Sequence, residues 1–514
     1  MNDKLNDALN QISDKHLAEA ENIQKAPHRR PYWIAAVAAV LGLVIGLTAF
    51  GNFFSPAGPT GPIQLEDPTR PTFTWPDFES TYPAGPEPGT IQAPETWGLA
   101  SLVAAPQYPE MVRYPDWKDH PNFAEYDPLL DAWKADQAAR YNQPQGYADS
   151  LADFFRQSIP QFLSAEENST YSPVNVYMAL AMLAETTDRA SRQQILDALG
   201  LETIEQLRQQ VKHMWNAHYS SDGQTSLLLG NSIWLSDRYS FHSDRLQLLA
   251  ENYYASSFQG EMGTDNFNDQ LRQWINANTG GLLQEQADTL ELDPRTAFAL
   301  VSTVYFSADW DLRFSDRLTE DKSFHSYNGD TVAAYMKQSL YRTYYRGSNF
   351  GAVELDLSGE NSMWLILPDE GFSVADILES DEYLRLTLDP GRWENKASGM
   401  YVHLQLPKFD VTARQDLADG IRSLGITAVF DPDTSDFSPI TDEPGLYISQ
   451  IDHTARVAID EEGCVAAAFT VIHLYASGFN PPTNEIEFIL DRPFLFVISS
   501  RDDLPLFAGT VVEP

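Results

Sequence analysis

One stretch near the C-terminus, residues 460–484, constrains the fold more than any other part of the chain. It reads DEEGCVAAAFTVIHLYASGFNPPTN: three acids and a glycine, a run of small residues, a mixed apolar segment, and then Gly, Asn and a proline pair. Side chains of a strand alternate between its two faces, whereas Gly, Asn and Pro clusters mark loops. The stretch is therefore able to form a strand but ends as a loop.

Alternation from Cys464 divides this stretch into two sets of side chains. One set is small or apolar and carries no charge, so it could face a core: Cys464, Ala466, Ala468, Thr470, Ile472 and Leu474. The other set would then point outward and includes Phe469, His473 and Tyr475. Two interpretations stay open at this point: an ordinary edge strand with its turn, or a loop that is able to join a sheet later.

The rest of the composition excludes several classes of function. A net charge of -39 argues against nucleic acid as a partner, because phosphates need a basic surface. The single cysteine excludes an internal disulfide framework, and the ten histidines show no metal-ligand spacing. The chain contains no G-x-S-x-G elbow, P-loop or G-x-G-x-x-G. We therefore expect the protein to bind no metal and no cofactor and not to be an enzyme. A surface hydrolase is the disfavoured alternative.

An apolar segment near the N-terminus predicts a membrane anchor. Residues 33–54 read WIAAVAAVLGLVIGLTAFGNFF, which is long enough to cross a hydrocarbon core of about 30 Å as a helix. A cleaved signal peptide is the alternative, disfavoured by the polar residues 1–30 in front of it. Lys25, Arg29 and Arg30 precede the segment, and the next basic residue is Arg70. The positive-inside rule then predicts a transmembrane helix over residues 31–54, with residues 1–30 cytoplasmic and the remainder outside the cell.

The segments that follow predict a spacer and then a globular domain. Residues 55–97 are rich in proline, which predicts a semi-rigid linker. Residues 98–145 are predicted to form an extension that packs on the following domain. From residue 146 the chain shows helical patterns, with a helix start at Ser172–Pro173 and a late helix around Ile421. It also shows strand-like apolar runs: FALVSTVYF at 298–306 and two C-terminal strands, 487–499 and 505–512. Since helices and strands do not alternate regularly, the fold class is α+β with large sheets.

Several segments of residues 146–514, in this order and at this spacing, resemble the serpin family of serine protease inhibitors. They are YSPVNVYMALAMLAETTDRASRQQILDALGL from Tyr171, INANTGGLLQ from Ile275, FALVSTVYFSADWDLRF from Phe298, LPKFDV from Leu406, RPFLFVI from Arg492 and PLFAGTVVEP from Pro505. The resemblance implies the serpin fold: a large mixed or antiparallel central sheet, further sheets and surrounding helices. With the anchor, it indicates a membrane-bound serpin of the bacterial type, acting as a monomer.

The resemblance places residues 460–484 on the reactive-centre loop. Its hinge comprises Glu461, Glu462, Gly463, Cys464, Val465, Ala466, Ala467 and Ala468. Small residues matter there because the hinge must slide between packed strands, and a bulky or charged inward side chain would cost a few kcal/mol. The family's spacing from the hinge glutamate puts the scissile bond at Ser477–Gly478, with Tyr475–Ala476 as the rival.

The residues around the scissile bond indicate the target. Ser477 suits the shallow pocket of elastase-like or subtilisin-like proteases, whereas Tyr475 would suit a chymotrypsin-like pocket. No Lys or Arg occurs between residues 461 and 491, so a trypsin-like target is not expected.

The family's shutter and breach positions, which control opening of the sheet, correspond here to Ser172, Asn175, Ser302, Trp310, Lys408 and His453. Three substitutions depart from the inhibitory pattern, and Phe469 extends the hinge with a large ring on its outward face. Cys464 replaces a Thr or Ser, Asn175 replaces a Ser, and Ser302 replaces the Asn expected to bond to His453. Lys408 and Glu461 match a family salt bridge. These departures put the tuning of loop insertion in doubt more than the fold.

The resemblance therefore predicts an inhibitor of extracellular serine proteases. The alternative is a non-inhibitory serpin that acts as a binding module at the cell surface. The hinge discriminates between the two, because non-inhibitory members tend to carry bulky or charged residues where this chain has Ala466, Ala467 and Ala468.

Overall fold

The computed structural model describes residues 101–115, 119–120, 122–144, 147–223, 225–448, 451–464 and 484–514. The predicted membrane helix over residues 31–54 lies outside them, as do residues 465–483 with Val465 to Ala468 and both predicted scissile bonds. No helix among the described residues is long and apolar enough to cross a membrane.

The first of two large sheets has eight strands, with β6 near its centre. Its order is β1-β5-β4-β6-β14-β13-β12, and β3 pairs with the start of β4. Neighbours are antiparallel except for β4 and β5. The bounds are β1 Leu102–Ala104, β3 Ser220–Ser221, β4 Thr225–Ser236, β5 Ala255–Gly260, β6 Phe298–Asp309, β12 Phe409–Asp416, β13 Asp452–Ile459 and β14 Gly463–Cys464.

The second sheet has nine strands in the order β15-β11-β8-β9-β10-β16-β17-β2, and β7 pairs with β8. The pairing of β11 with β15 is parallel. The bounds are β2 Ser169–Tyr171, β7 Glu320–Ser326, β8 Gly329–Arg346, β9 Phe350–Leu357, β10 Asn361–Pro368, β11 Lys396–Pro407, β15 Glu485–Ile489, β16 Phe494–Ser499 and β17 Pro505–Val511.

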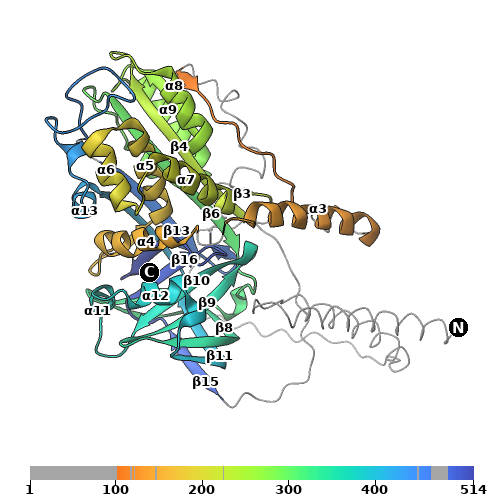
Figure 1. Cartoon of the computed structure of the whole chain (residues 1–514). Coiled ribbons are helices and arrows are strands. Elements are labelled where there is room, and N and C mark those ends of the chain that lie inside the picture. The colour runs from red at the N-terminus through yellow and green to blue at the C-terminus, as the bar shows by residue number, and fades with distance from the viewer. Residues whose placement is uncertain are drawn as a thin grey trace, which may run out of the picture. The chain divides into compact units, whose positions relative to one another are not determined.

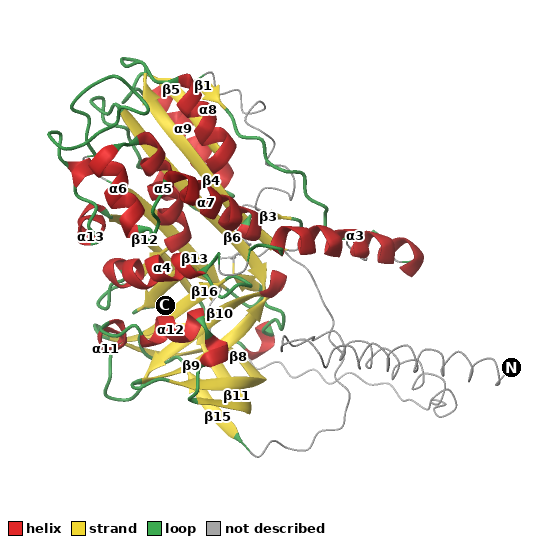
Figure 2. Ribbon diagram, viewed as in Figure 1, coloured by secondary structure: helices red, strands yellow, loops and turns green. Residues whose placement is uncertain are grey.

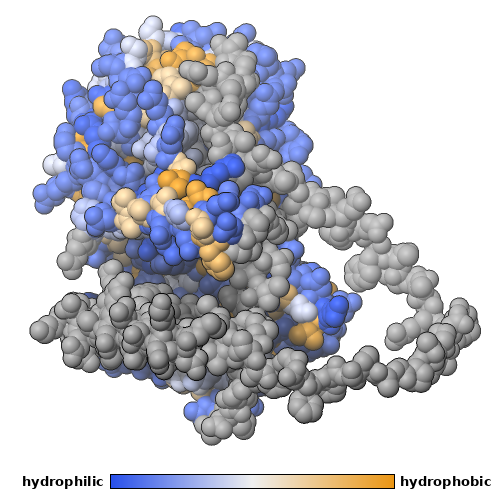
Figure 3. Space-filling view, turned by 90° about the vertical axis from the view of Figure 1, so that its right-hand side faces the viewer, coloured by the Kyte–Doolittle hydropathy of each residue, from blue (hydrophilic) through white to orange (hydrophobic). Residues whose placement is uncertain are grey.

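The longer helices gather around the first sheet, and the short helices α11 and α12 lie beside the second (Figure 2). The described surface on the side of α3 is mostly hydrophilic, in keeping with the acidic composition (Figure 3). The bounds are α3 Phe123–Tyr141, α4 Asp149–Phe162, α5 Pro173–Thr186, α6 Arg189–Ala198, α7 Ile204–His218, α8 Ser243–Tyr253, α9 Asp265–Asn278, α10 Gln284–Asp288, α11 Val374–Leu378, α12 Glu382–Leu388 and α13 Ala418–Ser423.

The two faces of β6 pack against different groups of residues. Phe306 and Ala308 are buried in the main core, and Val304 packs against it. Ala299 and Val301 instead pack against a smaller apolar cluster that includes residues of α9. Val304, Phe306 and Ala308 therefore share one face of β6, as the two-residue period of a strand requires, although Tyr305 between them also belongs to the main core.

The segment before the domain packs along the edge of the first sheet. β1 pairs with the edge strand β5, and Tyr108 stacks on three aromatic rings, with its centroid 6.0 Å from Trp215, 5.5 Å from Tyr219 and 5.8 Å from Tyr254. The helix α3, which projects from the body (Figure 1), is held at its C-terminal half because Trp133 donates to the carboxylate of Asp222 over 2.8 Å.

Most predicted elements form where the sequence places them. The Ser172–Pro173 pair starts α5, with the serine hydroxyl accepting from the Asn175 N–H. The apolar run at 298–306 lies in β6, and the helix expected around Ile421 is α13. One prediction is wrong: residues 487–499 are not a single strand but parts of β15 and β16. The break contains Pro493, which cannot donate to a strand ladder.

Candidate functional site

The hinge enters the first sheet as a two-residue strand. After β13 and a short turn, β14 places Gly463 and Cys464 between β13 and β6. Cys464 lies opposite Ala308 of β6 on one side and opposite Ile459 of β13 on the other. The described chain stops there and resumes at Asn484. The structure thus positions both ends of the predicted loop.

The backbone carbonyls of the turn before β14 accept hydrogen bonds from the segment that follows β6. The Trp310 N–H donates to the Glu462 carbonyl over 2.9 Å, and the Trp310 indole N–H donates to the Asp460 carbonyl over 2.8 Å. The Phe314 N–H donates to the Glu461 carbonyl over 3.0 Å. The turn itself is closed because the Asp460 carboxylate accepts from the Glu462 N–H. These bonds fix where the loop leaves the sheet.

The side chain of Glu461 is the main polar anchor of this turn. Its carboxylate lies 2.5 Å from the Lys408 ammonium and accepts from the Thr319 hydroxyl over 2.7 Å. Burial raises the pKa of the Glu461 carboxyl, but the hydrogen bonds from Lys408 and Thr319 outweigh burial, so the pKa lies below its usual value. The carboxylate is therefore charged at neutral pH and holds the hinge next to β12.

Gly463 and Cys464 fit the narrow space between the two strands. A Cβ atom at Gly463 would lie 2.3 Å from the Ala308 carbonyl oxygen and 2.7 Å from the Asp309 Cα, so only glycine fits without moving the backbone. The Cys464 side chain is buried in the main core. Burial, with a smaller contribution from Asp460, raises the pKa of its thiol to about 12. The thiol is therefore protonated and unreactive while β14 stays in the sheet.

Below β14, no strand pair joins β6 to β13 among the described residues. On the β4 side, β6 is paired from Phe298 to Ala308. On the β13 side, the pairs among the described residues are confined to Ala308 and Asp309, which face β14. β13 pairs with β12 over all eight of its residues but with β14 at Ile459 alone. We call the space between residues 298–306 of β6 and residues 453–458 of β13 the strand slot.

His453 lies at the far end of the strand slot and is neutral. It is 4% exposed, and burial lowers the pKa of its imidazole to about 4. Its Nε2 accepts from the Ser172 N–H over 3.2 Å, at the start of α5. The Ser172 hydroxyl in turn donates to the Leu506 carbonyl over 2.7 Å. The start of α5 thereby ties β13 to the second sheet.

Ser302 does not take over the role of the asparagine that the family pattern has at this position. Its hydroxyl donates to the Asn231 carboxamide oxygen of β4 over 2.8 Å, so this side chain bonds away from His453. Asn175 compensates in part, because its Nδ2 donates to the Ser302 carbonyl over 3.1 Å. The α5 N-terminus thus contacts β13 through Ser172 and β6 through Asn175.

The structure brings the predicted residues into two groups. The first surrounds the turn and contains Trp310, Lys408, Glu461, Glu462, Gly463 and Cys464; the second contains Ser172, Asn175, Ser302 and His453. Sequence reasoning missed Thr319, Asn231 and Leu506. Their partners lie 142, 71 and 334 positions away in the chain, so no local pattern could have identified them.

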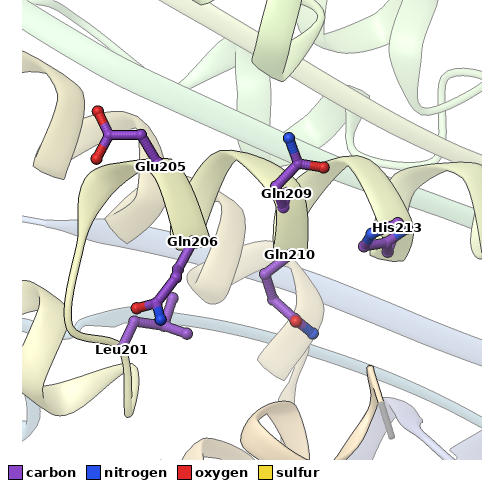
Figure 4. A pocket seen from close by; sticks show the side chains of 6 residues that line it. All are labelled: Leu201, Glu205, Gln206, Gln209, Gln210 and His213. Carbon is purple, nitrogen blue, oxygen red and sulfur yellow. The ribbon is translucent and has the colours of Figure 1, made fainter. Parts of the chain in front are cut away.

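A hollow elsewhere on the surface has no such arrangement. Figure 4 shows its side chains along α7 and the turn before it, in a row rather than facing one another: Leu201, Glu205, Gln206, Gln209, Gln210 and His213. With lining residues from one side only, the hollow lacks the enclosure that small-molecule sites require.

Comparison with known proteins decides the family. The family model described as serpin (serine protease inhibitor) matches residues 150–514. The chain is a serpin. Serpins are inhibitors of proteases rather than enzymes, although some are non-inhibitory. The expected fold, with mixed sheets and surrounding helices, is thereby confirmed.

The similarity extends to serpins of animals and plants and to solved structures. Serpin A3-5 of Bos taurus is 30% identical over 362 residues, covering 68% of this chain and 84% of that protein. Serpin-ZX of Arabidopsis thaliana is 26% identical over 371 residues, covering 68% and 93%. The thermophilic serpin tengpin in its native state gives a TM-score of 0.65 at 26% identity, covering 73% and 95%.

The Glu461–Lys408 pair predicts how firmly the hinge is held. We expect Lys408→Met to weaken the anchor by about 1 kcal/mol, since the Lys408 side chain is 38% exposed and water screens the pair. That corresponds to roughly fivefold faster reaction of Cys464 with dithiodipyridine at neutral pH, because β14 leaves the sheet more often. Lys396→Met, which removes an ammonium that donates to the Pro390 and Gly391 carbonyls, is the control.

The same pair gives the reaction a pH dependence. The folded-state pKa of Glu461 is depressed, so its stabilising contribution is present above the unfolded pKa and is lost as the pH falls through the folded pKa. The difference between wild type and Lys408→Met should therefore shrink in acid. Equal thiol reactivity of the two proteins at neutral pH would contradict the assigned role of the pair.

Proposed function

We propose that this serpin inhibits elastase-like or subtilisin-like serine proteases outside the cell, as a monomer, by presenting residues 465–483 as bait. The observation that carries the proposal is β14, a strand of two residues already seated between β6 and β13 at the head of the strand slot. Tengpin, a relative of similar fold, has been solved in both a native and a latent state. That pair of states supports a fold with more than one conformation.

The protease supplies the catalytic residues. This chain supplies the carbonyl group that is attacked and a loop that inserts into the sheet after cleavage. The protease serine attacks the loop carbonyl at Ser477, the Ser477–Gly478 bond breaks, and the amine leaves with a proton from the protease histidine. The freed loop then continues β14 into the sheet beyond Cys464 and carries the acylated protease with it. Displacement distorts the protease before water releases the acyl group.

The register of β14 gives the position of each loop residue after insertion. Cys464 faces Ala308 and Ile459, and each further step along the loop moves one residue back along both neighbours. The pairs expected are Ala466 with Phe306 and Val457, Ala468 with Val304 and Ala455, and Thr470 with Ser302 and His453.

This register puts small loop residues where the core has little space. Phe306, Val457 and Ala455 are 4%, 2% and 4% exposed, so side chains opposite them enter the interior. An alanine there overpacks nothing, whereas a large or charged residue would. Each backbone hydrogen bond formed with the strand slot contributes about 0.5–1.5 kcal/mol, which favours insertion over the exposed loop.

We further propose that residues 31–54 anchor this serpin in the cell membrane, with residues 55–97 as spacer. The support is the apolar run from Trp33 to Phe54 and the basic residues before it. The bait loop would then meet proteases that arrive at the cell surface.

The inward direction of Ala468 is tested by a matched pair of variants. Ala468→Glu places a carboxylate opposite Val304 and Ala455 in the core, which should slow insertion until the protease deacylates. Ala467→Glu places the same group on the other face, opposite Tyr305, which is 5% exposed, and opposite the positively charged Arg456. We expect Ala468→Glu to be cleaved but to trap at least about tenfold less protease, and Ala467→Glu to lose less, because Arg456 offsets its charge. Equal trapping by both variants would refute the register.

The scissile bond is tested by mass spectrometry of the C-terminal peptide released when the full chain reacts with a protease of either class. A peptide that begins at Gly478 supports Ser477 as the residue before the cut, and one that begins at Ala476 supports Tyr475. A first residue outside the range 475–480, in a complex that still inhibits, would contradict the placement of the loop.

Membrane topology is tested on intact cells that express the full chain. Protease added outside should remove the serpin domain and leave a small membrane-bound fragment that contains residues 1–54. A domain that resists digestion until the cells are lysed would refute the proposed orientation.

A further inference from the structure

The outward face of the second sheet carries aromatic and acidic residues next to the loop. β11 lies between β8 and β15, and its Tyr401 and His403 are opposite Tyr341 and Ser339 of β8. On the other side, the same two residues are opposite Glu485 and Glu487 of β15. We call the set Tyr341, Tyr401, His403, Glu485 and Glu487 the outer face. The outer face includes Glu485, which directly follows Asn484, the first described residue after the loop.

Tyr341 is exposed yet held in position. Its side chain is 67% exposed, and its ring lies over the backbone of Gly399, where a Cβ atom would come within 2.5 Å of the Tyr341 hydroxyl oxygen. Gly399 has φ +74° and lies in an irregular stretch of β11, a place where glycine is favoured. A tyrosine whose ring is already held in place loses little conformational entropy when a partner protein buries it. This is typical of an anchor residue in an interface.

His403 organises the polar part of the outer face. Its Nδ1 lies 3.0 Å from the Ser339 hydroxyl, its Nε2 lies 3.6 Å from the Glu485 carboxylate, and its ring meets Tyr401 edge-on at 5.2 Å. Glu485 and Glu487 are both exposed. Lys337, further along β8, is paired with Glu320. The outer face therefore offers negative charge beside aromatic rings, a combination that attracts Arg and Lys side chains.

The position of the outer face places it under any protease bound to the loop. The Tyr401 N–H donates to the Asn484 carbonyl over 3.0 Å, which fixes the end of the loop against β11. The bond after Ser477 is at most about 25 Å from Asn484 even in a fully extended chain. A protease of roughly 220 residues has a radius of gyration of about 17 Å, and a stable interface buries about 800 Å² on each partner. A protease of this size that is bound at the loop therefore extends over β8, β11 and β15.

We propose that the outer face is a second docking surface for the target protease and selects a protease that carries basic residues beside its active-site cleft. This inference rests on the proposed function, since it requires a protease bound at the loop. Loop residues decide which bond is cut, and the outer face decides how fast the complex forms.

The test is the second-order rate constant for consumption of the loop, measured with the full chain and a panel of elastase-like and subtilisin-like proteases. We expect Tyr341→Ala to lower this constant about tenfold for the protease that reacts fastest. The double variant Glu485→Gln with Glu487→Gln should lower it at low salt and flatten its salt dependence. Tyr447→Ala is the control. Tyr447 is 53% exposed and lies near Arg295, which precedes the first residue of β6, at the end of β6 opposite to β14.

The outcomes separate this inference from the proposed function. Loop consumption counts cleavage and trapping together, whereas the trapped fraction measures inhibition alone. Wild type that is cleaved without trapping overturns the proposed function, and the rate comparison still decides the role of the outer face. Rate constants for Tyr341→Ala and the acidic double variant that equal those of Tyr447→Ala overturn the docking surface. A chain that no protease in the panel cleaves within residues 465–483 overturns both.

Discussion

The structure depends on one constraint: among the described residues, β6 and β13 of the first sheet are joined only through the two residues of β14 at one end. β4 pairs with one edge of β6 from Phe298 to Ala308, while the described residues pair with the other edge at Ala308 and Asp309 alone. Backbone N–H and C=O groups at a strand edge are templates for a further strand. The sequence that follows Cys464 has the small, alternating pattern that such a strand needs. Under the proposed function, this place stays available until a protease cuts the loop.

Two polar clusters hold the strand slot at its ends. At the head, Glu461 and Lys408 secure the turn before β14. At the far end, the N-terminus of α5 contacts both strands, with the Ser172 N–H on His453 of β13 and the Asn175 side chain on the Ser302 carbonyl of β6. Because His453 is neutral and bonded to a backbone group, the substitution at Ser302 costs this site no buried charge. The second cluster thus holds the strands through α5 rather than through a direct bond between side chains of β6 and β13.

Much of this could be predicted from the sequence, because the signals are local. Ser172 and Pro173 start a helix by capping and by a fixed φ, and the nearly continuous apolar run at 298–306 favours a strand. Pairing across long stretches of chain was out of reach, which is why Thr319 and Asn231, whose partners lie 142 and 71 positions away, were missed. The division of residues 487–499 between β15 and β16 was missed for a related reason. An apolar pattern shows that strands form, but only the fold decides that one joins β11 and the next joins β10.

The most direct test of the central claim is hydrogen exchange on the full chain before and after its loop is cut by a protease that it does not trap. Insertion pairs new backbone groups with the strand slot, so amides of residues 298–306 in β6 and 453–458 in β13 should exchange more slowly after cleavage. The cut protein should also unfold at a higher temperature. Unchanged exchange in both strands, in a protein whose loop is fully cleaved, would contradict the account.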